Sequence, residues 1–409
     1  MVNVIRRYLK GDIIIWGVVI ALSVFSLIAV YSSTGTLAYK FQGGNTFYYF
    51  LKHSLFLLIG FLIIFITHHI PYKYYLRLSQ LFLFIAVPLL VLTLFIGVSI
   101  NQASRWVTLP GLGFTIQTSD FAKLAVIMYV ARMLSLKQHM IDDFKGAFLP
   151  IVAPVAIVAL LILPANLSTA IILFLVCLVL MFIGRIPFKY LFMLVLTGII
   201  VLALFIGIAM ITDYEGRINT WENRIESYIS GESEDNYQVE QAKIAILNGG
   251  VLGQGPGNSI QRNYLPQPYS DFIYAIILEE YGMVGGFIIL FLYLFLLFRA
   301  GVIVRKSDRT FPAFLAIGLT LLLVVQAMVN MGVAVNLFPV TGQTLPLVSM
   351  GGTSMLFTSV AIGIILSISR SNLTNDPDDA MMDNNYEETG DDQDEEIYEP
   401  EALIHEEEV

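Results

Sequence analysis

Charged residues are scarce in this sequence. Only 13% of its 409 residues are Asp, Glu, Lys or Arg, about half the fraction that a soluble domain carries. Hydrophobic residues make up 56% of the chain, and they occur in blocks of about 20, the length that a helix needs to cross a bilayer. The shortage of charge excludes an ordinary soluble domain and predicts an integral membrane protein. No feature indicates a nucleic-acid partner.

Cysteine is nearly absent, which excludes further kinds of chemistry. The single cysteine, Cys177, lies inside an apolar block, so no intramolecular disulfide can form and we interpret its thiol as packing. No Cys/His cluster of the zinc-binding kind occurs. The glycine-rich run at 249–257 is not followed by the Gly-Lys-Ser/Thr of a phosphate-binding loop. The sequence therefore predicts no metal site and no nucleotide-binding loop.

Basic residues are missing from the end of the chain. No Lys or Arg follows Arg370, whereas residues 376–408 hold sixteen Asp and Glu. The rest of the chain then has sixteen acids against 23 bases, so its net charge is +7 although the whole chain carries −9. Residues 371–409 have too little apolar content to fold alone. We expect an acidic, disordered cytoplasmic tail, either a solvated extension or a docking strip for a basic partner.

The apolar blocks predict an all-α membrane protein with ten transmembrane helices in one membrane domain, residues 12–370. The predicted spans lie near residues 12–32, 50–69, 78–99, 120–136, 146–163, 166–183, 188–211, 271–298, 310–333 and 345–369. The fourth, fifth and sixth are short or closely spaced, which leaves the count open by one.

The distribution of Lys and Arg predicts the orientation. If residues 1–11 are cytoplasmic and ten spans alternate, fifteen of the 23 basic residues fall on the cytoplasmic side. Cytoplasmic loops carry such an excess, so we expect both termini in the cytoplasm. The first apolar block is too long for a signal-peptide core and is interpreted as a retained anchor. A large outer loop, residues 212–270, then joins the seventh and eighth helices.

Ionisable residues gather on the predicted outer side. They are Arg105, Asp120, Lys123, Arg217, Arg224, Arg262 and Asp271. Singly, each has an ordinary explanation: Asp120 and Asp271 begin helices, where a carboxylate satisfies free N–H groups, and Lys123 can pair with Asp120 three residues away. Together they indicate a ligand path or reaction site, because such groups are costly at a bilayer boundary. Arg and Lys complement phosphate oxygens, so we expect an anionic amphiphile such as a lipid-linked pyrophosphate.

Four strings resemble the family of cell-shape, division and sporulation proteins that includes RodA and FtsW. Two are Arg105-Trp106 followed by Gln117-Thr118-Ser119-Asp120-Phe121-Ala122-Lys123, and Asn248-Gly249-Gly250-Val251-Leu252-Gly253-Gln254-Gly255-Pro256-Gly257. The two most specific run from Tyr264-Leu265-Pro266 through Ser270-Asp271-Phe272 to Gly282, and from Asn330-Met331-Gly332 through Pro339-Val340-Thr341-Gly342 to Gly352. The resemblance extends from about residue 12 to 370, everything but the tail.

This resemblance implies a ten-span fold and a peptidoglycan glycosyltransferase that polymerises lipid II outside the cytoplasmic membrane. It implies a class B penicillin-binding protein, a single-span transpeptidase, as partner, along with other division proteins. The family's essential aspartate falls on Asp271, which we expect to be the general base. The long tail favours a division-type, FtsW-like member over an elongation-type, RodA-like polymerase.

The expected substrate contacts surround Asp271. We expect positive charge where the pyrophosphate leaves, and assign substrate binding to Arg105, Trp106, Lys123, Arg217, Arg224 and Ser349. The residues expected to shape the pocket are Gln117, Ser119, Asp120, Gly249, Gly250, Asn330, Pro339, Gly342, Pro346, Gly351 and Gly352. No cofactor is implied; a divalent cation can share the pyrophosphate charge, but no outer acidic cluster requires one.

Four positions depart from the family pattern. Asp120 stands where the family usually has Glu, Asn166 where it commonly has an acid, Met350 where it has Tyr, and Gln343 where it has an apolar residue. The departures count against a catalytic role at these four positions. They leave intact the positions Asp271, Lys123, Arg105 and Ser349.

Two other classes of function stay open. A lipid II flippase needs a polar path through the bilayer midplane, usually with broken helices, whereas most predicted spans are apolar throughout. The main interruption is Pro164-Ala165-Asn166. A non-catalytic scaffold for the transpeptidase would not need the outer aspartate.

Overall fold

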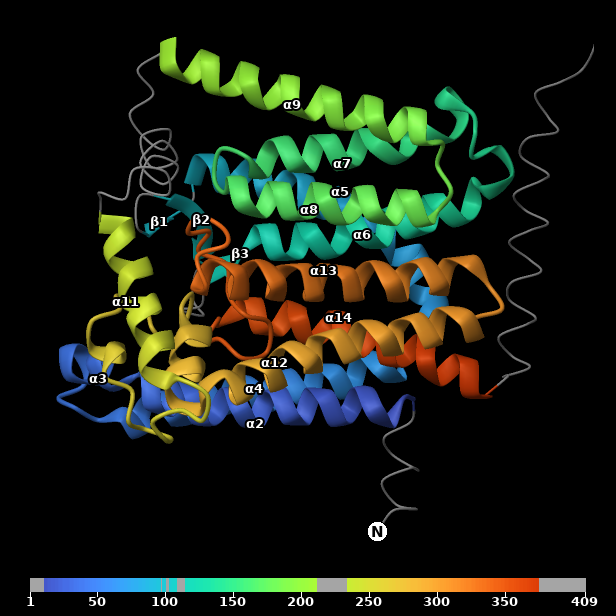
Figure 1. Cartoon of the computed structure of the whole chain (residues 1–409). Coiled ribbons are helices and arrows are strands. Elements are labelled where there is room, and N and C mark those ends of the chain that lie inside the picture. The colour runs from blue at the N-terminus through green and yellow to red at the C-terminus, as the bar shows by residue number, and fades with distance from the viewer. Residues whose placement is uncertain (1–10, 97, 101–102, 109–114, 212–233, 375–409) are drawn as a thin grey trace, which may run out of the picture.

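Long helices run side by side in a bundle, with short helices and a small sheet at one end (Figure 1). The computed structural model describes residues 11–96, 98–100, 103–108, 115–211 and 234–374. The bundle helices are α2 (Ile13–Ser33), α4 (Thr46–His69), α5 (Tyr72–Ile96), α6 (Thr118–Leu136), α7 (Leu149–Ile162), α8 (Leu167–Ile183), α9 (Phe188–Ile211), α12 (Ile273–Lys306), α13 (Thr310–Ala334) and α14 (Thr353–Thr374).

Eight helical segments among the described residues are long and apolar enough to cross a membrane. The α8 helix is apolar but has only 17 residues. The α6 helix is not among the eight, and it carries three ionisable residues, Asp120, Lys123 and Arg132. A multi-span membrane protein is therefore confirmed, while the count of ten spans stays a prediction.

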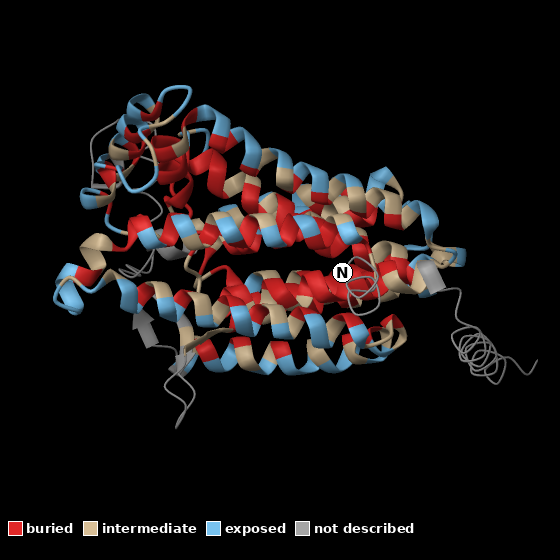
Figure 2. Ribbon diagram, turned by 90° about the horizontal axis from the view of Figure 1, so that it is seen from below, coloured by how far each residue is buried: buried red, intermediate tan, exposed pale blue. Residues whose placement is uncertain are grey.

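Buried residues fill the middle of the bundle and exposed ones follow its outer surface (Figure 2). The helices α6, α13 and α14 are largely buried. The α9 helix lies at the edge of the bundle (Figure 1) and exposes large apolar side chains such as Phe188 and Phe192. A rim of this kind suits hydrocarbon as solvent, because lipid tails are as apolar as these side chains.

Several predicted span boundaries were wrong. The second and third spans were predicted from residues 50 and 78, whereas α4 begins at Thr46 and α5 at Tyr72. The last span was predicted from residue 345, but α14 begins at Thr353, because Leu347 and Gly352 have positive φ angles that interrupt a helix. The eighth span was predicted to end at 298, whereas α12 continues to Lys306. Its added turns include Arg305 and Lys306, basic residues that favour a helix C-terminus.

One end of the bundle carries the short elements, α3 (Gly35–Phe41), α11 (Glu234–Gly249) and the sheet. The strands β1 (Val98–Ile100), β2 (Ala103–Thr108) and β3 (Thr115–Gln117) form an antiparallel sheet in the order β1-β2-β3. A purely helical fold was predicted, so this sheet corrects it. Single turns complete the connections: η1 (Gln138–Met140), η2 (Phe144–Phe148) and η3 (Gln261–Asn263).

The first and last bundle helices meet the same end of α12, opposite the sheet. Arg299 Nε donates to Asp12, the N-cap of α2, at 2.9 Å. Asn372, near the end of α14, donates to the Ile303 carbonyl at 3.0 Å. The chain thus enters and leaves the bundle at one end, as an even number of crossings requires. Residues 1–10, 212–233 and 375–409 lie outside the described residues, so the N-terminus, part of the loop 212–270 and most of the tail stay predictions.

The α12 helix is broken at Gly282, where φ is 66° and ψ is −167°. In an unbroken helix the carbonyls of Glu279 and Glu280 would accept from the amides four residues later. Here they accept instead from Gln254 N at 3.0 Å and Gly255 N at 2.9 Å. The glycine-rich segment thus supplies donors that the helix no longer provides.

Backbone carbonyls of the same segment also accept hydrogen bonds from the two amides that lose their helical partners at the break. Met283 N donates to the Gly250 carbonyl at 3.0 Å, and Val284 N donates to the Val251 carbonyl at 3.3 Å. So close an approach needs glycine: a Cβ on Gly253 would lie 2.2 Å from the Glu280 carbonyl oxygen. The glycine-rich run at residues 249–257 therefore acts as a splint for the broken helix: it packs against the break and supplies the missing hydrogen-bond partners.

Candidate functional site

Asp271 lies two residues before α12, in a segment held by its backbone. Asn330 Nδ2, on α13, donates to the Asp271 carbonyl at 2.9 Å. The Ser270 hydroxyl donates to Asp271 Oδ1 at 2.9 Å, and the Asp271 side chain is only half-buried. The main chain is thus fixed while Asp271 remains partly exposed, an arrangement suited to proton transfer.

The loop before α14 clamps the residues preceding Asp271. The Ser349 hydroxyl donates to the Ser270 carbonyl at 2.7 Å and accepts from Leu345 N at 2.8 Å. Met350 N donates to the Tyr269 carbonyl at 2.9 Å. Ser349 was predicted to bind substrate; the structure brings it beside Asp271, where its buried hydroxyl joins two backbone segments.

The predicted pocket residues of this loop give it its shape. Gly342 and Gly352 have φ angles of 64° and 53°, which favour glycine. The Pro346 carbonyl accepts from the Tyr293 hydroxyl on α12. Asn330 donates to the Gln343 carbonyl at 2.7 Å as well as to Asp271. Thus the loop is tied to both α12 and α13. The predicted Pro339 and Gly351 lie in the same non-helical stretch.

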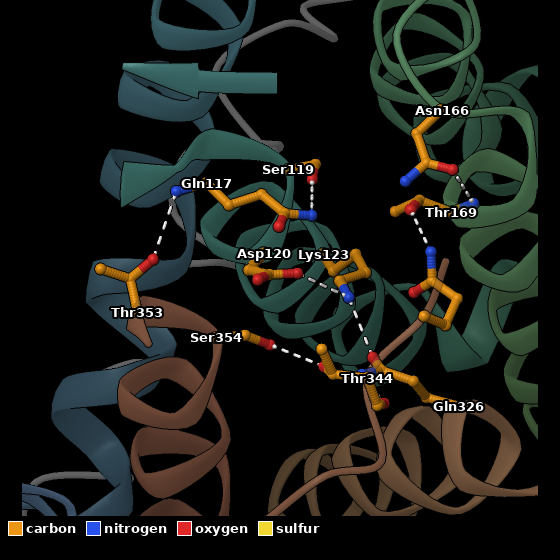
Figure 3. A network of polar contacts seen from close by, with 11 residues as sticks. Gln117, Ser119, Asp120, Lys123, Asn166, Thr169, Gln326, Thr344, Thr353 and Ser354 are labelled. Atoms are coloured by element: carbon orange, nitrogen blue, oxygen red, sulfur yellow. Dashed lines mark hydrogen bonds and ion pairs between the residues drawn. The ribbon is translucent and has the colours of Figure 1, made fainter. Parts of the chain in front are cut away.

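Lys123 and Asp120 form a buried ion pair one turn into α6. Lys123 Nζ lies 2.8 Å from Asp120 Oδ1 and donates to Gln326 Oε1 at 3.0 Å. Gln326 Nε2 in turn donates to the Thr344 carbonyl at 3.0 Å. In Figure 3 these residues face one another across α6, α13 and the loop before α14. The pair is therefore linked through Gln326 to the loop that clamps Asp271.

A second branch of polar contacts reaches α8. Gln343 Nε2 donates to Thr169 Oγ1 at 2.8 Å, and Thr169 N donates to Asn166 Oδ1 at 3.2 Å, which caps α8 (Figure 3). Asn166 Nδ2 and Asp120 Oδ2 are buried and have no hydrogen-bond partner within the described part of the chain. Such atoms are costly unless water or a ligand reaches them. Asn166 also lines a small cavity together with Leu90, Thr93, Leu94, Thr118, Ser119, Leu161, Ile162 and Ala165.

The sheet brings two further predicted residues to this end. Trp106 in β2 pairs with Gln117 in β3. Gln117 Nε2 donates to Ser119 Oγ at 3.1 Å, and Gln117 N donates to Thr353 Oγ1 at 3.4 Å. These contacts join the sheet to α6 and α14.

The remaining predicted residues fall into two groups. The Arg105 side chain and all of Arg217 and Arg224 lie outside the described residues. Gly249 and Gly250 belong to the splint against α12. At Gly249 a Cβ would lie 1.9 Å from the Leu278 carbonyl oxygen, so its role is close packing.

Sequence reasoning missed Gln326 and Glu279 as organising residues. Gln326 bridges Lys123 to Thr344. Glu279 is fully buried and accepts from the amides of Ile260 and Gln261 at 3.1 and 3.3 Å. A polar residue inside an apolar span is expensive and marks function or structure, and that signal was available for both.

The surroundings of Asp271 also affect its neighbour Tyr269. Burial, then the nearby Tyr49 and Asp271, raise the pKa of Tyr269 above its ordinary value. The phenol is therefore neutral at physiological pH and can act only as a hydrogen-bonding or packing group. Among the described residues no group of three or more His, Cys, Asp or Glu is placed to hold a metal ion.

The chain is similar to known proteins over most of its length. The family of cell cycle proteins that includes FtsW, RodA and SpoVE matches residues 12–374. A probable peptidoglycan glycosyltransferase FtsW of Trichlorobacter lovleyi is 34% identical over 381 residues, 90% of this chain and 96% of that protein. Stage V sporulation protein E of Bacillus subtilis is 34% identical over 370 residues, 88% of this chain and 97% of that protein.

Solved structures share the fold. The rod shape determining protein RodA of Thermus thermophilus matches with a TM-score of 0.65 and 22% identity, over 90% of this chain and 99% of that one. A chain of a peptidoglycan synthase complex, described as coordinating polymerization and crosslinking, matches with a TM-score of 0.66 and 23% identity, over 89% and 99%. On the family match and these relatives, the chain belongs to the FtsW, RodA and SpoVE family of cell cycle proteins, as its motifs predicted.

Proposed function

We propose that this protein is a peptidoglycan glycosyltransferase that polymerises lipid II at the outer face of the bacterial cytoplasmic membrane, in cell division. Relatives named peptidoglycan glycosyltransferase FtsW support the activity and the division role. The observation that carries the assignment is Asp271, a half-buried carboxylate on a backbone fixed by Asn330 and Ser349. A general base needs this combination of a fixed position and an accessible carboxylate.

Asp271 acts as the base in a single displacement. A sugar hydroxyl of one lipid II attacks the anomeric carbon of another and forms the new glycosidic bond. Asp271 takes the hydroxyl proton, and the bond to polyprenyl pyrophosphate breaks with its electron pair on the leaving group. The configuration inverts, so no covalent sugar–enzyme intermediate forms. Proton transfer of this kind contributes about 10²–10⁴-fold to the rate.

The basic residues predicted for the outer side stabilise the leaving pyrophosphate. Arg105, Arg217 and Arg224 provide positive charge where negative charge develops, and Trp106 completes the substrate site. Lys123 already has a partner in Asp120, so it contributes when the pair opens or by orienting the loop through Gln326. A divalent cation can share the pyrophosphate charge.

The proposal extends to topology and partner. Ten spans, with both termini cytoplasmic, put the sheet, α11 and Asp271 on the outer side. The partner is a class B penicillin-binding protein, which crosslinks the glycan within a division complex; the similarity in fold to a chain of a peptidoglycan synthase complex supports it. The acidic tail extends into the cytoplasm.

The test is polymerisation by purified protein with its transpeptidase partner, using lipid II as substrate. Asp271→Asn keeps the size of the side chain and removes the base, so we expect the rate to fall about 10²–10⁴-fold. Asp308→Asn is the matched control, because Asp308 is exposed in the turn between α12 and α13. Wild-type polymerisation by a folded Asp271→Asn protein would refute the assignment.

The same variants separate the other classes of function. A flippase would move the lipid II headgroup across a vesicle without making glycan, whereas a polymerase makes glycan from lipid II already on the outer side. A scaffold would support division after Asp271→Asn. Depletion in cells separates the two polymerase roles: filaments indicate division and rounded cells indicate elongation.

A further inference from the structure

We propose that His53 is a positioning residue for the Asp271 segment, and that it acts through Ser26 and the Val348 carbonyl. The inference rests on the proposed role of Asp271. It concerns residues of α2 and α4 that carry no family motif quoted above and that do not touch the polar residues of Figure 3 in any described contact.

The three groups form a buried chain of hydrogen bonds. His53 Nε2 on α4 lies 2.7 Å from Ser26 Oγ on α2, and Ser26 Oγ donates to the Val348 carbonyl at 2.8 Å. The side chains of His53 and Ser26 are buried, as is Val348. A hydroxyl has one proton to donate, and the Ser26 hydroxyl donates it in a hydrogen bond to the Val348 carbonyl. His53 must therefore be the donor to Ser26, which fixes a proton on Nε2.

The chain ends on the peptide unit that orients Ser349. The Val348 carbonyl and the Ser349 amide belong to one rigid plane. Ser26 holds the carbonyl side of this plane, and Ser349 N donates to the Leu345 carbonyl at 2.9 Å on the other side. A rotation of the plane moves the Ser349 hydroxyl, which holds the Ser270 carbonyl at 2.7 Å. His53 is thus linked to the residue next to Asp271 by successive short contacts.

A purely structural side chain would not need an imidazole at this position. His53 lies in a largely apolar helix, where a polar ring is costly. The adjacent Ser54 shows the contrast, because its buried hydroxyl has no hydrogen-bond partner among the described residues. Of the two neighbours, only His53 is connected to the loop that clamps Asp271.

The kinetic test compares three variants with the wild-type protein. His53→Leu removes the donor, and we expect kcat for lipid II polymerisation to fall about 10-fold or more, since small displacements of a reacting group are costly. KM should stay unchanged, because no substrate contact is lost. His53→Gln places an amide N–H near the position of Nε2 and should restore most of kcat. Ser54→Ala, the matched control, should equal wild type.

A double variant tests the connection through Ser26. If His53 acts through Ser26, the Ser26→Ala/His53→Leu protein is no slower than Ser26→Ala alone. Additive losses would overturn the proposal. So would wild-type kcat in His53→Leu, a rise in KM without a fall in kcat, or a failure of His53→Gln to restore activity in a folded protein.

Hydrogen exchange makes this test independent of Asp271 chemistry. In an Asp271→Asn background, His53→Leu should speed exchange of the Ser349 and Met350 amides, and Ser54→Ala should not. Unchanged exchange of these two amides in the His53→Leu protein would overturn the proposed connection from His53 to the loop. Full polymerisation by Asp271→Asn with faster exchange in His53→Leu would instead refute the proposed base and leave the connection from His53 to the loop standing.

Discussion

Replacing Gly253 by alanine should undock the glycine-rich splint from the break in α12. Gly253 has a φ of +83°, where an alanine costs about 1–2 kcal/mol. Its Cβ would also lie 2.2 Å from the Glu280 carbonyl oxygen. That neighbour is backbone and cannot rotate away, so the clash is relieved only when the segment separates from α12.

Local separation at Gly253 removes two of the four hydrogen bonds between the splint and α12, the two that directly follow Gly253 in the chain, from Gln254 N to the Glu279 carbonyl and from Gly255 N to the Glu280 carbonyl. Each contributes about 1 kcal/mol net. Together with the backbone strain, Gly253→Ala should therefore weaken docking by roughly 3–4 kcal/mol. Gly257→Ala is a matched control, because Gly257 has a φ of +78° but no atom within 4 Å of its Cβ position. It should cost only the strain of about 1–2 kcal/mol.

The assay is hydrogen exchange of the Gln254 and Gly255 amides in lipid nanodiscs. A difference of about 2 kcal/mol between the variants corresponds to roughly 30-fold faster exchange in Gly253→Ala than in Gly257→Ala. Lipid II polymerisation should fall in the same order, since α12 follows Asp271 directly. Equal exchange in the two variants would refute the argument that the glycine run braces the break.

Two further predictions concern charge and pH. Lys123→Met leaves the Asp120 carboxylate buried without its partner and should lower the free energy of unfolding by about 3–5 kcal/mol. The double variant Asp120→Asn/Lys123→Met should lose less stability, because no buried charge is left unpaired. Thermal unfolding in nanodiscs measures both variants, and an equal loss would contradict the pairing. Because the folded state raises the pKa of Tyr269, it binds the phenol proton more tightly than the unfolded chain, so stability should fall as pH rises above about 10, the unfolded value. Tyr269→Phe should lack that part of the fall, and absorbance titration of the two proteins should differ by one high-pKa phenol.

The membrane architecture could be predicted from the sequence, because the positions of the apolar blocks determine which segments can span a bilayer. A run of about 20 apolar residues has few alternatives to a spanning helix, and the blocks predicted most helix positions correctly. Errors occurred where backbone conformation overruled composition. Leu347 and Gly352 keep residues before Thr353 out of α14, although the segment is as apolar as a span. The strands at residues 98–117 were missed because they are short.

The candidate site was predicted in part. Motifs identified Asp271, Asn330 and Ser349 as belonging together, since each lies in a string that resembles the family. Their contacts were not predictable, because residues 270 and 349 are far apart in the chain and meet only through tertiary packing. Gln326 carried a signal, as a polar residue in an apolar span, but its two partners come from different helices and loops.

The sequence by itself determined that this chain is a membrane protein of the FtsW, RodA and SpoVE family and which carboxylate stands before α12, because these depend on local composition and on contiguous strings. Tertiary structure alone decided what the polar residues do. In the folded protein the glycine-rich run packs against the break in α12 and supplies its hydrogen-bond partners. His53 is connected by hydrogen bonds through Ser26 to the loop that holds Asp271. These roles depend on hydrogen bonds between residues distant in the chain, whose geometry arises only when the helices pack.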